Sequence, residues 1–238
     1  MPRQNNPLKM SAECGSGREI ISVRSSDDNL YKVCLRGTHK ANSMESEFNF
    51  SDFMDEYVAD LAKALIGLDK KAIEEFANAV ELVMDNGGTV HFIGNGGSAG
   101  TPSHSAGDWS KELTLPTICH VDNISGLTAW ANDTDYENVF KGQLQTFLRH
   151  GDLVVGYSGS GNSANVLNGI RFARDKGCTT VAVTGNYKGM NGGKLAEMAD
   201  IVINSDTESM ERIEDLQLVV NHIVKESIKA RRNITGHC

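Results

Sequence analysis

From residue 89 to residue 231 the sequence alternates short apolar runs with segments of helical periodicity. Continuous apolar runs separated by helices are typical of parallel strands that are buried on both faces of a sheet. The pattern therefore predicts an α/β fold, a three-layer αβα sandwich around a five-stranded parallel sheet. We expect its strands at about 89–93, 116–121, 152–157, 179–184 and 200–204, and its helices near 98–112, 135–149, 163–176, 190–198 and 208–231.

Two amphipathic helices are expected before this sheet. Apolar residues recur at helical spacing from Phe53 to Leu65 and again from Ile73 to Met84, where Asn86-Gly87-Gly88 gives a stop signal. Residues 1–43 are polar, with strand-like pieces only around 20–23 and 30–35. We interpret 1–43 as a poorly ordered extension or a small hairpin, and 44–238 as one domain with a helical N-terminal segment.

Charge and composition restrict the class of function. The chain carries a net charge of −8, and its acidic groups are concentrated after residue 43. An acidic domain disfavours nonspecific nucleic-acid binding, which depends on Lys and Arg contacts to phosphates. No apolar run approaches the roughly 20 residues of a membrane span, so we expect a cytoplasmic protein with no membrane partner. The five cysteines lack CxxC spacing, which argues against a disulfide framework or a thiolate zinc site.

Two glycine-rich turns follow predicted strands and precede predicted helices. They read Gly94-Asn-Gly-Gly-Ser98 and Ser158-Gly-Ser-Gly-Asn-Ser163. Glycines permit tight turns and close approach of a ligand, while hydroxyls and free amides at a helix N-terminus favour an anion such as phosphate. Either turn alone could be only a tight connection. Because ligands of parallel sheets bind at the carboxyl ends of the strands, the two together predict cradles for phosphate or sugar.

Histidines and carboxylates on two helices form a candidate metal site. His104 and Asp108 are four residues apart and share one helix face, while Glu214 and His222 lie on the last predicted helix. Two histidines and two carboxylates suit Zn²⁺ or a similar divalent ion, provided that the helices face each other. Taken singly, a helical histidine is more often a surface residue, and Glu214 could simply pair with the nearby Arg212.

Four segments in order resemble the sugar isomerase (SIS) family, and within it the phosphoheptose isomerases. The resemblance covers roughly residues 50–230. The four segments are Gly94-Asn-Gly-Gly-Ser98 with His104, Leu127-Thr-Ala-Trp-Ala-Asn-Asp133 with Tyr136-Glu-Asn-Val-Phe140, Ser158-Gly-Ser-Gly-Asn-Ser163 with Asn165-Val-Leu167, and Arg212-Ile-Glu214 with His222. It implies a flavodoxin-like SIS fold. It also implies an aldose–ketose isomerase that converts sedoheptulose 7-phosphate to D-glycero-D-manno-heptose 7-phosphate through an enediol.

The resemblance also implies roles for individual residues. A zinc-ligand histidine falls on His104, the family's catalytic glutamate on Asp108, its ligand glutamine on Glu214, and its second catalytic histidine on His222. This gives Asp108 and His222 as catalytic residues, and His104, Asp108, Glu214 and His222 as metal ligands. The implied substrate and phosphate contacts are Asn95, Ser98, Asp133, Ser158, Gly159, Ser160, Asn162 and Ser163.

The chain departs from the family pattern at three positions. Asp108 is one methylene shorter than glutamate, Glu214 replaces a neutral amide with a charge, and Glu112 stands where an arginine is usual. Two alternatives therefore stay open: an SIS isomerase for another phosphosugar, and a non-catalytic SIS regulator that binds a phosphosugar or a protein. The intact set of acid, base and ligand groups favours an enzyme. The resemblance further implies a homotetramer with active sites at subunit contacts, and the amphipathic N-terminal helices are consistent with it.

Overall fold

The computed structural model describes residues 18–24, 30–36 and 48–235. The chain divides into two compact units, Met1–Leu68 and Asp69–Cys238. In the described ranges, no helix has both the length and the apolar character that a membrane span requires.

The first unit contains a hairpin and one helix. Strands β1 (Arg18–Arg24) and β2 (Leu30–Arg36) pair antiparallel, with Arg18 opposite Arg36. These strands coincide with the two strand-like pieces of the sequence, while the rest of residues 1–43 lies outside the described residues. Helix α1 (Phe50–Ile66) begins after Asn49, whose side-chain oxygen accepts the backbone N–H groups of Ser51 and Asp52. This cap satisfies amides that an N-terminal helical turn leaves unpaired.

The second unit is built on a five-stranded parallel sheet in the order β4-β3-β5-β6-β7. Its strands are β3 (Val90–Gly94), β4 (Thr117–Cys119), β5 (Leu153–Ser158), β6 (Thr179–Gly185) and β7 (Ile201–Ser205). Every ladder is parallel, so the predicted fold class is confirmed. The chain moves from β3 to β4 on one side and then to β5 on the other. The turns after β3 and β5 consequently meet where the strand order reverses, which is the usual ligand position in such sheets.

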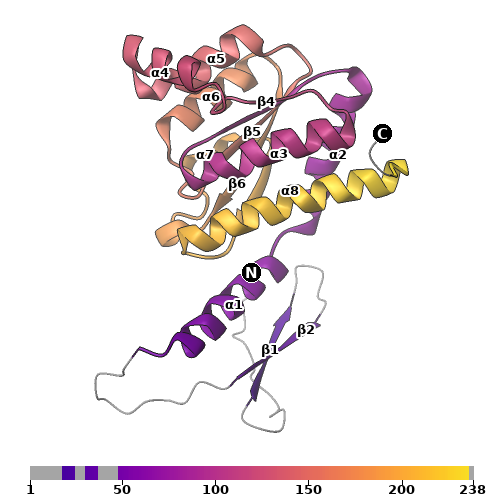
Figure 1. Cartoon of the computed structure of the whole chain (residues 1–238), viewed down its shortest axis with the longest axis vertical. Coiled ribbons are helices and arrows are strands. Elements are labelled where there is room, and N and C mark those ends of the chain that lie inside the picture. Colours follow the sequence, from indigo (N-terminus) through magenta and orange to yellow (C-terminus); the bar gives the residue numbers. More distant parts are fainter. Residues whose placement is uncertain (1–17, 25–29, 37–47, 236–238) are drawn as a thin grey trace, which may run out of the picture. The chain divides into compact units, whose positions relative to one another are not determined.

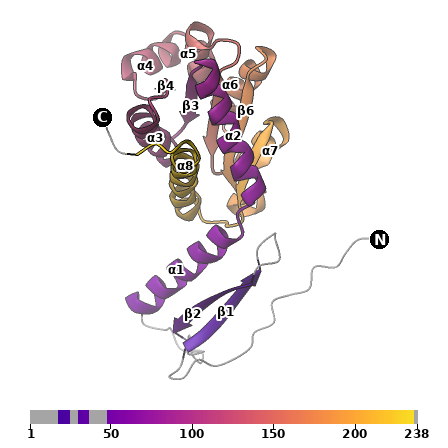
Figure 2. The same ribbon diagram turned by 90° about the vertical axis from the view of Figure 1, so that its right-hand side faces the viewer.

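Helices cover both faces of this sheet (Figures 1 and 2). One layer contains α2 (Lys70–Asn86), α3 (Gly97–Leu113) and α8 (Met210–Arg232). The other contains α5 (Val139–Phe147), α6 (Ala164–Asp175) and α7 (Gly193–Met198). Under the first layer, Trp109 lies against Phe92 and Phe76, with ring centroids 5.4 and 5.8 Å apart. Under the second, Ile93 joins a buried cluster with Phe140 and Ile170.

Helix α4 (Ile124–Asp133) was not predicted from the sequence. Its partly buried apolar residues, Leu127, Trp130 and Ala131, recur at helical spacing but span little more than one turn. The helix begins at Asn123, whose side chain accepts the backbone N–H of Gly126. The helix expected over 135–149 is also shorter, because a 3₁₀ turn, η1 (Tyr136–Asn138), precedes α5. Likewise η2 (Tyr187–Gly189) precedes α7, which begins at Gly193 rather than at residue 190.

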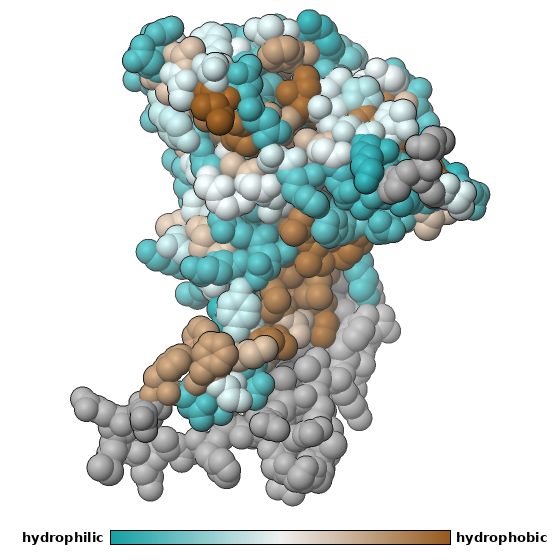
Figure 3. All heavy atoms as spheres, in the orientation of Figure 1, coloured by the Kyte–Doolittle hydropathy of each residue, from teal (hydrophilic) through white to brown (hydrophobic). Residues whose placement is uncertain are grey.

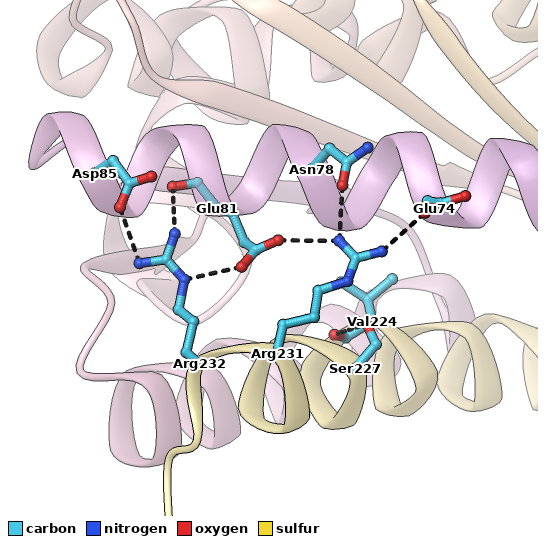
Figure 4. A network of polar contacts seen from close by, with 8 residues as sticks. All are labelled: Glu74, Asn78, Glu81, Asp85, Val224, Ser227, Arg231 and Arg232. Carbon is cyan, nitrogen blue, oxygen red and sulfur yellow. Dashed lines mark hydrogen bonds and ion pairs between the residues drawn. The ribbon is translucent and has the colours of Figure 1, made fainter.

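An ionic network joins the C-terminal turns of α8 to α2 (Figure 4). Arg231 and Arg232 donate to the carboxylate of Glu81 at 3.0 and 2.9 Å, and they also bind Glu74, Asn78 and Asp85. Charge-assisted guanidinium–carboxylate bonds with this geometry are stronger than neutral ones. The network therefore fixes how α8, the helix that carries His222, lies against the rest of this unit.

Candidate active site

The turn after β5 forms a compact loop of hydroxyls and amides. The Ser158 hydroxyl accepts the backbone N–H of Gly161 at 3.1 Å and lies 3.2 Å from the hydroxyl of Ser163. Gly161 has φ of 64°, a left-handed conformation that suits glycine. Ser163 occupies the N-cap position of α6, yet its side chain makes no capping bond. The hydroxyls of Ser160 and Ser163, both only partly buried, and the first amides of α6 thus form a suitable set of donors for an anion.

Neighbouring residues brace this loop. The Asn162 amide donates to the Ser160 carbonyl at 2.8 Å, and its oxygen accepts the backbone N–H of Lys194 at 3.3 Å. Gly159 is buried, and a Cβ at that position would lie 2.3 Å from the sulfur of Met210, the first residue of α8. The loop therefore packs directly on the N-terminal end of α8.

The turn after β3 has a different environment, because a carboxylate of the chain itself lies against it. The backbone N–H of Ser98 donates to Glu214, and a Cβ on Gly97 would lie 2.1 Å from Glu214 Oε2. The buried hydroxyl of Ser98 accepts a bond from Gln217 at 3.0 Å. Burial raises the pKa of Glu214, the Ser98 amide opposes this shift, and nearby Glu211 and Asp215 add to it. A phosphate at the start of α3 would meet this carboxylate, so the loop after β5 is the better anion cradle.

A pair of asparagines joins the two turns. Asn95 and Asn165 exchange two side-chain amide bonds of 2.8 Å each, and the Tyr136 hydroxyl donates to Asn95 Oδ1 at 2.9 Å. The pairing is possible because β3 and β5 are neighbours, with Gly94 opposite Tyr157. The Asn95 amide is thus engaged within the chain. The predicted contact Asp133 ends α4, is exposed, and accepts a bond of 2.9 Å from Asn132.

Three of the four predicted metal ligands come together between α3 and α8. His104 and Asp108 of α3 and His222 of α8 offer ligand atoms that all lie within 4.8 Å of one another. The two histidine Nε2 atoms are 3.3 Å apart. Two nitrogens at about 2.0–2.1 Å from a tetrahedral zinc ion are separated by about 3.3 Å, so the imidazoles fit a shared ion. Glu214 is not in this group, because its carboxylate lies at the start of α3.

A buried chain of hydrogen bonds holds the backbone next to the two histidines. The Tyr157 hydroxyl donates to Asn221 at 2.8 Å, the Asn221 amide donates to Ser105 at 2.6 Å, and the Ser105 hydroxyl donates to the Thr101 carbonyl at 2.9 Å. Asn221 and Ser105 are almost fully buried and are the sequence neighbours of His222 and His104. The sheet is thereby tied to both helices at the level of the histidine pair.

Sequence reasoning missed Lys225, which lies behind Asp108. Its ammonium is 2.6 Å from Asp108 Oδ2, 3.3 Å from Glu226 Oε1 and 3.5 Å from Glu112 Oε1. Burial alone would lower the pKa of this lysine, but the hydrogen bonds that its ammonium donates to Asp108 and Glu226 outweigh burial and raise the pKa. A signal was present in the sequence: Lys225 follows His222 by three residues and therefore shares its helix face.

Comparison with known proteins identifies the family. A family model described as the SIS domain matches residues 53–185. The chain belongs to the SIS-domain family. This SIS-domain protein is 37% identical over 176 residues to a probable phosphoheptose isomerase of Thermoplasma volcanium, covering 72% of the chain and 88% of that relative. It is 39% identical over 158 residues to a phosphoheptose isomerase of Rhodospirillum rubrum, covering 64% of the chain and 82% of the relative.

The solved structures agree with this assignment. The phosphoheptose isomerase of Neisseria gonorrhoeae superposes with a TM-score of 0.69 at 28% sequence identity, over 76% of this chain and 99% of that one. The match covers almost the whole of the solved enzyme, so the two chains share the fold over that length. The SIS-domain protein is therefore an isomerase.

Proposed function

We propose that this protein is a metal-dependent aldose–ketose isomerase that converts sedoheptulose 7-phosphate to D-glycero-D-manno-heptose 7-phosphate. The observation that carries the proposal is the group formed by His104, Asp108 and His222, a carboxylate and two imidazoles within 4.8 Å. The relatives named phosphoheptose isomerase support the choice of substrate. A binding module has no need for acid, base and ligand groups in one place.

The reaction moves a proton between C1 and C2 through an enediol. A base must take the proton from C1 of the ketose, and the same proton or one from solvent must return to C2. In our proposal the Asp108 carboxylate handles the carbon-bound proton, and His222 moves a proton between the two oxygens. The hydroxyls of Ser158, Ser160 and Ser163 hold the phosphate, with Asn95, Ser98, Asp133, Gly159 and Asn162 lining the sugar. Such anchoring sets the reacting carbons against the acid and base.

The donor set also suits a divalent ion, with zinc as our first choice. His104 and His222 would hold it with Asp108, and Glu214 would join them if its side chain turned away from Gly97. When bound, the ion supplies a Lewis acid that stabilises negative charge on the substrate oxygens. We expect about one ion per chain by elemental mass spectrometry, and loss of turnover after chelation.

The separation between cradle and histidines favours a site completed by a second protomer. The loop after β5 packs on Met210, and His222 is twelve residues further along α8, a rise of about 18 Å. Eight bonds separate C1 of a seven-carbon sugar from a phosphorus on C7, and an extended chain of that length spans about 10 Å at about 1.2 Å per bond. We therefore propose a homotetramer in which each site combines residues of two subunits.

A second candidate is an isomerase of the same type for another phosphosugar. Asp108 favours it, because its carboxylate reaches one methylene less far than the glutamate of the resembling enzymes. A substrate with a different chain length would place its reacting carbons differently from the phosphate. Proton NMR of the protein with sedoheptulose 7-phosphate, and then with shorter ketose phosphates, separates the two candidates.

Exchange of carbon-bound hydrogen tests the chemistry directly. In heavy water the wild-type protein should wash deuterium into C1 or C2, while Asp108→Asn and His222→Ala should lower kcat by at least about a hundredfold. Calorimetric binding of the phosphosugar should survive in both variants, since the loop after β5 is untouched. Wild-type protein that binds sedoheptulose 7-phosphate without exchange or product would contradict the isomerase and favour a regulator.

A further inference from the structure

Asp108 belongs to a ladder of alternating charges between α3 and α8. Asp108 and Glu112 are one helical turn apart on α3, and Lys225 and Lys229 are one turn apart on α8. Lys225 Nζ lies 2.6 Å from Asp108 and 3.5 Å from Glu112, and Lys229 Nζ lies 2.5 Å from Glu112. The side chains of Lys225, Glu112 and Asp108 are only 8%, 13% and 17% exposed. These contacts are therefore screened by water much less than ordinary surface ion pairs.

Lys225 differs from Lys229 because its carboxylate partner belongs to the group that contains the two histidines. Lys225 holds Oδ2 of Asp108, and Asp108 has a ligand oxygen within 4.8 Å of the nitrogens of His104 and His222. Lys229 holds Glu112, which is one turn further from the histidines. An aspartate has few rotatable bonds, so fixing one carboxylate oxygen largely fixes the position of the other.

We propose that Lys225 is a positioning residue of the isomerase reaction. Its ammonium holds Asp108 by Oδ2, so that the carboxylate presents one oxygen to the histidine group with part of its charge neutralised. This inference rests on the proposed function, in which Asp108 handles the carbon-bound proton or a cation. Lys225 itself touches neither the substrate nor an ion, and it acts through Asp108.

Kinetics of a neutral variant test this role. Lys225→Met should lower kcat for the phosphosugar by about tenfold or more, because displacing a catalytic group by even about 1 Å is costly. KM should stay within about twofold, since the phosphate is held by the remote loop after β5. Lys225→Arg should recover most of kcat. Lys229→Met, the matched control on the next turn of α8, should keep kcat within about twofold.

Cobalt binding gives a readout that does not depend on turnover. Removing the Lys225 ammonium frees Asp108 and removes a positive charge next to the histidine pair, so Lys225→Met should bind Co²⁺ at least about threefold more tightly. Visible absorption follows the titration. A variant with damaged packing would lose cobalt affinity and kcat together, whereas the proposed role moves them in opposite directions.

The role also requires that Lys225 act through Asp108. On an Asp108→Asn background, Lys225→Met should change kcat by less than about twofold. If Lys225→Met fails to fold, Lys225→Gln replaces it in every comparison. An unchanged kcat, an equal loss in Lys229→Met, or weaker cobalt binding would overturn the inference. A wild-type protein inactive on sedoheptulose 7-phosphate would reject the substrate, while the cobalt comparison of Lys225→Met with Lys229→Met would still decide the position of Lys225.

Discussion

Ser163 stands at the N-cap of α6 without bonding to the amides of that helix. Its hydroxyl lies beside that of Ser158 and is available to a ligand, and the Ser160 hydroxyl is partly exposed in the same loop. We predict that Ser160→Ala and Ser163→Ala each raise KM for the phosphosugar by roughly ten- to a hundredfold. Loss of a hydrogen bond to a charged group costs about 1.5–3 kcal/mol. Steady-state kinetics measure the effect.

Ser227→Ala serves as the control for these variants. Its hydroxyl donates to the Val224 carbonyl within α8 at 2.7 Å (Figure 4), so its removal should leave KM unchanged. If KM is the same in all three variants and the wild type, the loop after β5 is only a tight connection.

Spacing along a helix predicted that His104 and Asp108 share a face, because residues four apart lie one turn from each other. His222 joins them only because α3 and α8 are adjacent in the fold, which the sequence analysis had to assume. Helical spacing could not predict the position of the Glu214 carboxylate. The position of that side chain depends on Gly97, which leaves room for the carboxylate, and on the free amide of Ser98. The partner of Asp108 was missed for a similar reason: a lysine on a polar helix usually faces solvent, and only the crossing of α3 and α8 encloses Lys225.

At the scale of elements, buried strands were predictable and partly buried helices were not. The strands β3, β5 and β6 are buried on both faces, and their short, mostly apolar runs can be recognised directly in the sequence. Helix α4 packs against α5 and η1 and places only half-buried residues such as Leu127 and Trp130 on the core, so its apolar pattern is short. The strand order and the adjacency of the two turns come from long-range pairing, which a local pattern does not specify.

The sheet also contains a buried histidine pair that links three strands. His91 of β3 lies 3.0 Å from His120, which follows β4, and 3.2 Å from Asp152, which precedes β5. Asp152 also accepts the backbone N–H groups of Thr89 and Arg149. Burial lowers the pKa of His91 against the opposing effect of Asp152, and burial followed by the neighbouring His91 lowers the pKa of His120 to about 3.

These shifts predict a loss of stability in mild acid. Unfolded histidines have a pKa of about 6.5, so below that pH the unfolded chain binds protons that the folded chain excludes. The free energy of unfolding should therefore fall as the pH drops below about 6.5, and His120 alone should contribute about 2 kcal/mol of loss by pH 5. Urea unfolding at pH 7.5 and pH 5 measures it.

A variant separates this contribution from that of the carboxylates. His120→Gln should be less stable at pH 7.5 but should lose less stability on going to pH 5, while the exposed His150→Gln should behave as the wild type. Equal unfolding free energies of the wild type at the two pH values would show that the histidines remain able to take up protons in the folded state.

At the scale of the whole molecule, the two units differ in how fully they bury their apolar side chains. The second unit has a complete core on both faces of its sheet. The boundary predicted at residue 43 stays a prediction, because residues 37–47 lie outside the described residues.

In the first unit, α1 exposes large apolar side chains along one side, among them Phe50, Phe53, Met54 and Val58, which are 48–68% exposed. Figure 3 shows this gathering of apolar surface on α1. Exposed apolar patches of this kind mark interaction surfaces.

Subunit association through α1 gives the last prediction. The variant Phe53→Glu/Val58→Glu places two charges in the apolar stripe, so it should dissociate a tetramer, which size-exclusion chromatography with light scattering would measure. Glu56→Lys changes an exposed charge on the same helix and should leave the mass unchanged. A double variant with unchanged mass would assign association to another surface. If each site combines two subunits, dissociation should abolish isomerisation while the monomer keeps a folded second unit, because the loop after β5 would no longer face a histidine pair.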